Sequence, residues 1–388
     1  MTPRWATTVI FAVNGAAVGT WVAQIPWVQE RFDLSKSAVG LLILAMAISV
    51  ILALPIAGQA VVRHGSERML LLGGIVCVLA VNLPILAPAP LLVAAGLFVF
   101  GGASATMDVS MNSHGVSVEK ALRRPIMSSL HAGWAFGGMG GAGFVALCHA
   151  LGLEAHLITA IASALLLTVL LYAAPRVGHG SAAEGDDTPG FTFPSRGVVV
   201  LAVLCFLVMI TEGAMADWSG LYMRQDLRAS AAVAALAYSF FTAGMTVGRL
   251  VGDAINARIG PVALLRGGAL LTGIPLAALL LIGQPATALF GLFLVGLGVA
   301  NGVPLMFSAA GRQPDTPPGP GIAAVSSMGS LGFLAGPPVF GFIADATSLP
   351  WSLSLLIIGA VVVFLLAYRV AGEREPVPAD RPRPLPVP

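Results

Sequence analysis

Charged residues are scarce in this sequence. Only 10% of the 388 residues are Asp, Glu, Lys or Arg, 57% are hydrophobic and the mean hydropathy is +0.90. A soluble domain usually carries about 25% charged residues, so this chain has too little polar surface to cover a soluble particle. We expect an integral membrane protein. The net charge of +2 indicates no particular partner beyond the lipid bilayer, and we expect no nucleic-acid partner.

Several chemical signatures are also missing. The three cysteines, Cys77, Cys148 and Cys205, lie in apolar stretches without metal-ligand spacing and are interpreted as packing residues. No Gly-x-x-x-x-Gly-Lys-Ser/Thr segment, zinc spacing or catalytic triad is present. The stretch Gly138–Gly143 spells Gly-x-Gly-x-x-Gly, but it lies within an apolar helix, where small residues allow helices to pack closely. We therefore expect no cofactor, no metal and no enzymatic activity.

Long apolar runs dominate what remains. About 20 apolar residues cross a bilayer as a helix, and about twelve such windows follow one another. This pattern predicts an all-α polytopic membrane protein. The expected spans are 6–28, 38–62, 69–88, 90–115, 126–149, 154–174, 197–222, 231–256, 262–283, 285–310, 320–346 and 350–371.

A polar stretch, Ala173–Arg196, divides the chain nearly in half. We expect an N-terminal six-helix bundle over 1–174, a cytoplasmic linker over 175–196 and a C-terminal six-helix bundle over 197–371. The Pro-rich, charged segment 372–388 predicts a disordered cytoplasmic tail. With both termini in the cytoplasm, about fifteen Lys and Arg residues would lie inside and about four outside, the bias typical of inner-membrane proteins.

The two halves resemble each other at an offset of about 195–198 residues. "RHG" at Arg63–Gly65 matches "RIG" at Arg258–Gly260, and Ser128–Phe144 matches Ser326–Phe342 in its paired serines and terminal Gly-Phe. These matches predict a duplicated six-helix unit. Parallel six-plus-six repeats are typical of transporters that hold the solute between the halves, near the middle of the membrane.

These features resemble the major facilitator superfamily over essentially the whole chain. "GQAVVRHGSER" from Gly58 is similar to the family's Gly-x-x-x-Asp-x-x-Gly-Arg loop, although Val62 stands where the family has Asp. "GRLVGDAINARIG" from Gly248 is the C-terminal counterpart. "MDVSMNSHGVSVE" and "SSLHAGWAFGG" resemble the branch that holds rhizopine-transport-like proteins, a relative of the fucose–proton symporters. The resemblance implies a monomeric transporter with a sugar-like or inositol-derived solute.

Asp108 is unusual because it lies where the chain still reads as buried in lipid. Ser104, Asp108 and Asn112 follow an i, i+4, i+8 stripe, so they share one helix face, which must point into the bundle. Asp108 is a candidate proton-coupling site, with Asn112 beside it as a candidate solute ligand. The alternative is a buried carboxylate that a neighbour neutralises to hold helices together.

Other polar residues extend the candidate site. His131 shares a face with Trp134 and lies at the depth of Asp108, so an Asp–His proton relay is one hypothesis and a hydrogen-bonding filler is the other. Glu212, near the middle of its span, is the second proton-site candidate, while Asp217 lies nearer the outside. A carboxylic acid that takes up a proton in one facing and releases it in the other couples proton flow to transport.

An aromatic and amide face is expected on the first helix. Asn14, Trp21 and Gln24 lie close to one another around the helix, an arrangement that suits a polyhydroxylated ring. The alternative for Trp21 is a place in the interfacial aromatic belt. Asn301 is expected to face the same cavity, and Trp134 is a further candidate ligand.

A gate is expected at the cytoplasmic end. Arg249 and Asp253 are four residues apart on one helix and, with Arg258, favour an inner gate or helix-end latch over a solute site. Arg63 is the corresponding residue in the first half.

The leading hypothesis is a proton-coupled importer of a small polar solute that works by alternating access. An exporter of metabolites or drugs is the alternative, although the Gly-Pro signature that drug–proton antiporters of the family carry on the fifth helix is missing from "GWAFGGMGGAGF". A receptor or scaffold without flux would need a sizeable soluble segment, and the loops are short.

Overall fold

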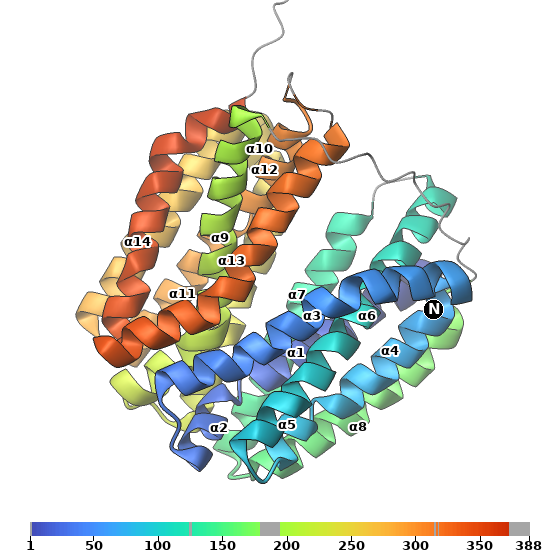
Figure 1. Ribbon diagram of the computed structural model, residues 1–388, viewed down its shortest axis with the longest axis vertical. Coiled ribbons are helices and arrows are strands. Elements are labelled where there is room, and N and C mark those ends of the chain that lie inside the picture. The colour runs from blue at the N-terminus through green and yellow to red at the C-terminus, as the bar shows by residue number, and fades with distance from the viewer. Residues whose placement is uncertain (1, 124–125, 179–194, 314–315, 317, 372–388) are drawn as a thin grey trace, which may run out of the picture.

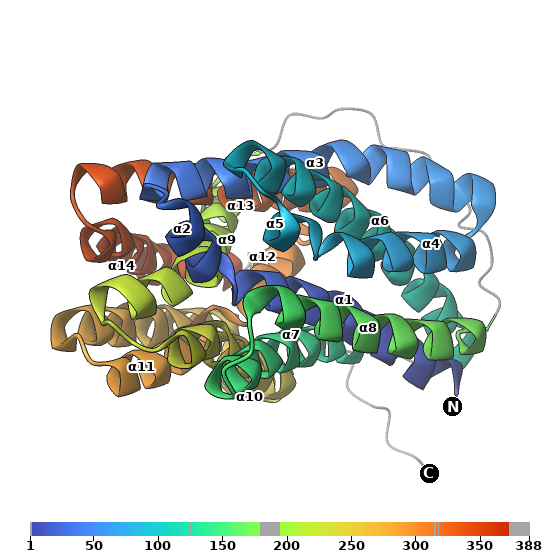
Figure 2. The ribbon, with the colours of Figure 1, turned by 90° about the horizontal axis from the view of Figure 1, so that it is seen from below.

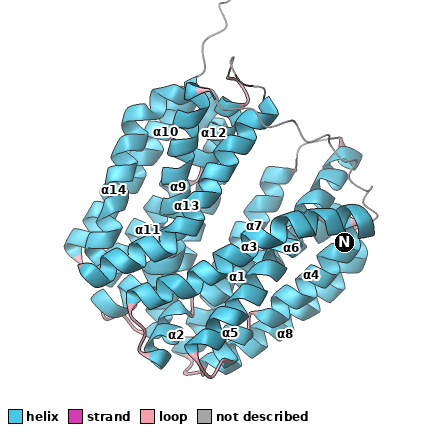
Figure 3. Cartoon of the chain, viewed as in Figure 1, coloured by secondary structure: helices cyan, strands magenta, loops and turns pink. Residues whose placement is uncertain are grey.

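A computed structural model describes residues 2–123, 126–178, 195–313, 316 and 318–371. These residues form helices and connecting turns without a β-strand (Figure 3). The first half contains α1 (Pro3–Val22), α2 (Ile25–Phe32), α3 (Lys36–His64), α4 (Ser66–Ala80), α5 (Leu83–Leu86), α6 (Pro90–Leu122), α7 (Met127–Ala150), α8 (Ala155–Ala173) and η1 (Ala174–Arg176). The second half contains α9 (Arg196–Leu221), η2 (Tyr222–Asp226), α10 (Ala231–Ile282), α11 (Pro285–Val299), α12 (Gly302–Ala310), α13 (Pro318–Ala346), α14 (Leu349–Leu366) and η3 (Ala367–Ala371).

The helices are arranged in two bundles, one from each half of the chain (Figure 1). The bundles meet where α3 packs on α13 and where α7 packs on α10. They approach each other at the end that carries α2 and spread apart at the other end (Figure 1). Figure 2 views the molecule from the end that carries α2, with α3 beside α13. We call the first the α2 end. The second is the linker end, because η1 finishes and α9 begins there.

The number of membrane-spanning helices agrees with the sequence pattern. Ten helical stretches are long and apolar enough to cross a membrane. One of them, α10, contains two helices that join at Gly260, and α7, with 24 residues, has the length to span although it is not among the ten. The predicted all-α fold of about twelve spans in two bundles is confirmed.

The matched glycines of the two halves have the same structural role. Gly65 lies between α3 and α4 with φ 85° and ψ 147°, and Gly260 breaks α10 with φ 81° and ψ 164°. A side chain strains this backbone region, so glycine is required where each chain segment turns between two neighbouring helices. The sequence match of "RHG" with "RIG" therefore marks equivalent turns of the two bundles.

Three expected spans are interrupted near prolines. The first breaks at Ala23–Gln24 before Pro26, the third at Val81–Asn82 before Pro84, and the tenth at Ala300–Asn301 before Pro304. Proline lacks an N–H group and fits best in the first turn of a helix. Each expected span therefore ends early and is followed by a shorter helix, which the apolar pattern alone did not indicate.

Glycine and alanine bring α1 and α7 into backbone contact. A Cβ placed on Gly137 would meet the carbonyl of Ala12, and a Cβ on Gly141 would meet the carbonyl of Ala16. The contacts repeat every four residues along both helices, as expected for small residues in membrane helix packing. In the second bundle, Gly244 approaches the backbone of α11 in the same way.

This packing predicts a clear difference between two neighbouring substitutions. Gly141→Ala is expected to lower the melting temperature by about 5 °C or more, because the new methyl group pushes α1 away from α7. Gly140→Ala is the matched control, since no atom lies within 4 Å of a Cβ there and alanine favours a helix over glycine. Thermal unfolding of the two purified variants in detergent provides the measurement. Equal melting temperatures would contradict the close α1–α7 contact.

Candidate functional site

A central cavity of about 340 Å³ lies between the two bundles. Helices α1, α3 and α7 line it from the first half, and α9, α10 and α13 line it from the second. The lining residues are Val18, Trp21, Val22, Ile43, Met46, Ala47, Val50, Ile51, Leu54, Trp134, Ala135, Met209, Glu212, Ala216, Asp217, Tyr238, Phe241, Thr242, Met245, Ser330, Phe333, Leu334 and Pro337. The cavity is large enough for a small organic solute.

Two tryptophans form the wall of the cavity on the side of the first half. Trp21 and Trp134 both line it, so the aromatic face expected on α1 is present for Trp21. The Nε1 group of Trp134 donates to Oδ1 of buried Asn14 at 2.8 Å, and Nδ2 of Asn14 donates to Oγ of Ser104 at 3.3 Å. Asn14 therefore does not line the cavity itself. It fixes the orientation of Trp134.

Two carboxylates of α9 line the cavity on the side of the second half. Glu212 Oε1 lies 3.8 Å from Nη2 of Arg249 on α10, and the two side chains are 15% and 26% exposed. The distance is long for a hydrogen bond, and of the two residues only Glu212 lines the cavity. Asp217, 5 residues further along α9, has no hydrogen bond or ion pair with any described residue.

Asp108 lies apart from these carboxylates. Its Oδ1 accepts a hydrogen bond from Nδ2 of Asn112 at 3.1 Å, and neither residue is among those that line the central cavity. The predicted stripe faces the first bundle at Ser104, which contacts α1 through Asn14. Asn112 lies on the same helix and is uncharged, so this contact neither neutralises Asp108 nor joins two helices, and both interpretations of Asp108 stay predictions.

The predicted Asp108–His131 relay is not formed. His131 packs edge-to-face against Phe11, with ring centroids 5.3 Å apart. Within the described ranges, no hydrogen bond or ion pair joins His131 to Asp108. The two residues belong to sequence-adjacent helices, but each turns its side chain to a different neighbour.

Two predicted solute ligands are used inside their own bundles. Nε2 of Gln24 donates to Oγ1 of Thr159 on α8 at 2.6 Å, and Nδ2 of Asn301 donates to the carbonyl of Gly248 on α10 at 3.0 Å. Neither side chain lines the central cavity, which corrects both assignments. Polar side chains in a membrane bundle join neighbouring helices as readily as they bind a solute.

The predicted gate at the linker end differs from the structure. Arg249 lies against Glu212 instead of forming a local latch with Asp253. Arg63, Asp253 and Arg258 are exposed, and among the described residues no ion pair involves them. Arg249 lies beside the cavity carboxylate Glu212, so the structure connects it with the candidate proton site rather than with a gate alone.

Polar contacts join the two halves at the α2 end, and sequence reasoning missed them. The N–H groups of Lys36 and Ser37, which begin α3, donate to the carboxylate of Asp345 in the last turn of α13 at 2.9 and 2.8 Å. Nε of Arg224 lies 2.5 Å from Oε1 of Glu30. A further contact there joins Gln225 to Gln29. Nearer the cavity, the hydroxyl of Ser239 on α10 donates to the carbonyl of Met139 on α7.

At the linker end, no hydrogen bond or ion pair between described residues joins the halves. Among the described residues, polar contacts therefore join the halves on the α2 side only, and the bundles spread apart at the linker end (Figure 1). A sequence signal for this seal existed, since an acid in the last turn of a helix opposes the dipole of its own helix. Asp345 instead faces the favourable N-terminus of α3.

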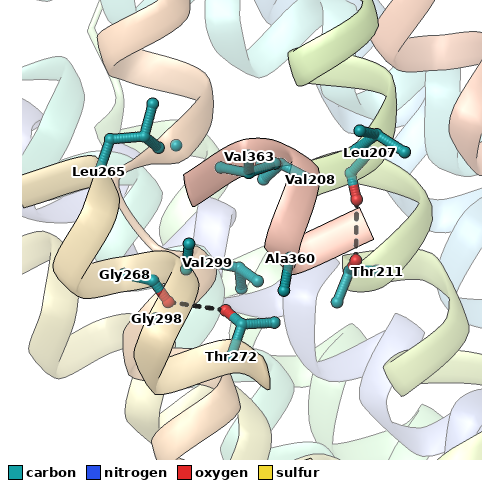
Figure 4. Close-up of a pocket in the computed structure, with 12 residues that line it drawn as sticks. Leu207, Val208, Thr211, Leu265, Gly268, Thr272, Gly298, Val299, Ala360 and Val363 are labelled. Carbon is teal, nitrogen blue, oxygen red and sulfur yellow. Dashed lines mark hydrogen bonds between the residues drawn. The ribbon is translucent and has the colours of Figure 1, made fainter. Parts of the chain in front are cut away.

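A second, small cavity of about 20 Å³ lies within the C-terminal bundle (Figure 4). Its two hydroxyl groups are satisfied locally, since Thr211 donates to the carbonyl of Leu207 and Thr272 donates to that of Gly268. Its other lining side chains are apolar. It has room for about one water molecule, so we exclude it as a solute site.

Two helix bundles around a central cavity, joined by polar contacts at one end, are typical of membrane transporters. The model of the Major Facilitator Superfamily matches residues 7–319 and 221–387. The chain therefore belongs to the major facilitator superfamily, as the sequence resemblance indicated.

Curated relatives match along nearly the whole chain. An uncharacterized MFS-type transporter of Yersinia pestis is 35% identical over 368 residues, covering 95% of this chain and 94% of the relative. Membrane protein MosC of Rhizobium meliloti is 31% identical over 380 residues, covering 94% and 90%. Both relatives are bacterial, and both are similar to this chain in length.

Solved structures share the fold at low sequence identity. A mutant of the nucleoside transporter NupG has a TM-score of 0.78 at 12% identity, covering 95% of this chain and 100% of its own. A bacterial homolog of the human lysosomal transporter Spinster, in an inward-facing and occupied conformation, has a TM-score of 0.76 at 15% identity, covering 95% and 96%. The E. coli fucose:proton symporter FucP has a TM-score of 0.61 at 16% identity, covering 95% and 98%.

Proposed function

We propose that the chain is a proton-coupled importer of a small organic solute in the bacterial inner membrane, with both termini in the cytoplasm. The observation that carries this proposal is the Glu212–Arg249 pair beside a cavity between two bundles. The ionised carboxylate pairs with arginine, and it can bind a proton instead when access changes sides and the pair separates. The contacts at the α2 end and their lack at the linker end among the described residues support an inward-facing state.

Alternating access requires that the seal moves from one end to the other. The α2-end contacts between Asp345 and the start of α3, and between Arg224 and Glu30, are polar and exposed. Exposed polar contacts are individually weak, so they open at modest cost. Rocking of the bundles about the cavity then exposes Glu212 and the solute to the opposite side.

The cavity favours a solute with an apolar or ring-shaped body. Most of its lining is aliphatic, aromatic or methionine, and the few polar groups are Thr242, Ser330, Tyr238 and the two carboxylates. That the solute is a fully hydroxylated ring, as the sequence resemblance implied, stays a prediction. Trp21 and Trp134 would stack on such a ring, but the amides expected to bind its hydroxyl groups lie elsewhere.

The test uses purified protein in liposomes that contain a pH-sensitive dye. Inward gradients of neutral sugars, inositols, amino derivatives and aromatic amines are applied one at a time. We expect one solute class to drive protons inward and to accumulate faster when the outside is acidic. Flux of that solute which ignores an imposed pH gradient would overturn proton coupling.

The same liposomes discriminate an exporter. The largely apolar lining is the observation that favours this second function, because amphipathic compounds fit it. An antiporter moves protons against the direction of the solute, so the dye signal would have the opposite sign. A solute-dependent proton efflux would replace import by export and leave the cavity assignment unchanged.

A further inference from the structure

The charged groups that line the central cavity are all acidic. Glu212 and Asp217 line it, whereas none of its lining residues is Lys, Arg or His. Glu212 has Arg249 as a partner at 3.8 Å. Asp217 has none among the described residues, so one negative charge of this cavity is not compensated by the protein.

An uncompensated carboxylate in such a place is costly. An ionised acid that faces apolar walls loses much of its hydration, and membrane proteins keep such groups where they serve a pathway. Only 10% of the residues of this chain are charged, so a charged residue such as Asp217 is unusual inside it and points to a functional role. Either a proton or a cation of the solute is needed to balance Asp217.

The walls around Asp217 suit a cation with an apolar body. Tyr238 lies within electrostatic reach of both Asp217 and Glu212. Trp21, Trp134 and Phe241 complete the aromatic surface. Aromatic faces attract cations, and this attraction grows when water is excluded. Met46, Met209 and Met245 also line the cavity and adapt to irregular apolar shapes.

We propose that Asp217 binds the positively charged centre of the solute, so that the cavity selects monovalent organic cations with an aromatic or aliphatic body. This inference rests on the proposed function and names the substrate class of the same cavity. Asp217 and Glu212 divide two tasks. Asp217 recognises the charge of the solute, and Glu212 carries the proton with Arg249.

Proton competition follows from this assignment. The titratable or charged groups near Asp217 are Glu212 on the same helix and Tyr238 on α10, with Arg249 beyond Glu212. Acidification protonates the carboxylates and removes the negative charge that attracts a cation. The affinity for a permanently charged cation is therefore expected to fall as the pH falls.

The test measures equilibrium binding to the purified, full-length protein by calorimetry. The probes are benzyltrimethylammonium, whose charge does not change with pH, phenylacetate, which has a similar ring and the opposite charge, and myo-inositol. We expect only the first to bind. Asp217→Asn is expected to weaken that binding at least tenfold, whereas Asp217→Glu retains it and shows that the site is intact.

Asp253→Asn is the matched control, because Asp253 is an exposed acid outside the cavity. This substitution is expected to leave the affinity for benzyltrimethylammonium unchanged. No binding of benzyltrimethylammonium, or equal binding by wild type and Asp217→Asn, would overturn the inference. If that result accompanies solute-driven proton movement in liposomes, the proposed function stands and only the cationic substrate class is lost.

Discussion

Glu212→Gln is expected to abolish solute-driven proton movement while solute exchange continues. Glutamine has nearly the shape of glutamic acid but cannot release or take up a proton. Exchange of solute across the membrane needs only the loaded carrier to change its facing, so it does not require deprotonation. Arg249, left without its partner, is 26% exposed and can be hydrated from the cavity. The measurement compares proton movement with counterflow of the solute in the same liposomes.

Asp108→Asn is the control for this prediction. Asp108 bonds to Asn112 on its own helix and does not line the cavity, so its substitution is expected to reduce proton movement and exchange equally. A result in which Asp108→Asn separates the two activities, and Glu212→Gln does not, would move the proton site from α9 to α6.

Loosening the α2 end is the second large expected effect. Asp345→Ala combined with Arg224→Ala removes the carboxylate that caps α3 and the arginine that pairs with Glu30. A helix cap contributes about 0.5–2 kcal/mol and an exposed ion pair about 0.2–1 kcal/mol. A combined loss of about 2 kcal/mol shifts the ratio of inward-facing to outward-facing molecules roughly thirtyfold toward the outward-facing state.

Spin labels measure this shift directly. Leu86 and Trp351 are exposed at the α2 end, on different bundles, and the three native cysteines are buried and can be replaced. We expect a longer distance between labels at these positions in the double variant. Asp33→Asn is the matched control, since Asp33 is an exposed acid at the same end whose carboxylate has no hydrogen bond or ion pair with another described residue. An unchanged distance distribution would show that these contacts do not hold the seal.

The sequence predicted the fold well because its signals are local. Apolar length defined the spans, and the glycine matches at Gly65 and Gly260 identified equivalent turns of two related bundles. Breaks near Pro26, Pro84 and Pro304 were missed because the hydropathy on both sides of each break stays high. Proline inside an apolar window would not have been enough to find them, because α3 continues through Pro55 and α13 through Pro337 and Pro338.

The site was predicted only in part, because it depends on how each helix is rotated. Trp21, Trp134 and Glu212 line the cavity, whereas Gln24 and Asn301 bond to neighbouring helices of their own bundle. In the sequence, all of these residues are polar or aromatic side chains inside apolar spans. Only the packing of the helices shows which of them face the cavity. The spacing of Arg249 and Asp253 suggested a local pair, but the partner of Arg249 comes from α9, 37 residues away in the sequence.

The most direct test of the central claim is the reactivity of a cysteine at Ser330. Ser330 lines the central cavity from α13 and is exposed. In a cysteine-free protein, Ser330→Cys is expected to react with a membrane-impermeant maleimide faster in everted vesicles than in right-side-out vesicles. The transported solute should slow that reaction. Equal rates in both vesicle types, unaffected by any solute that drives proton movement, would contradict a solute route through this cavity.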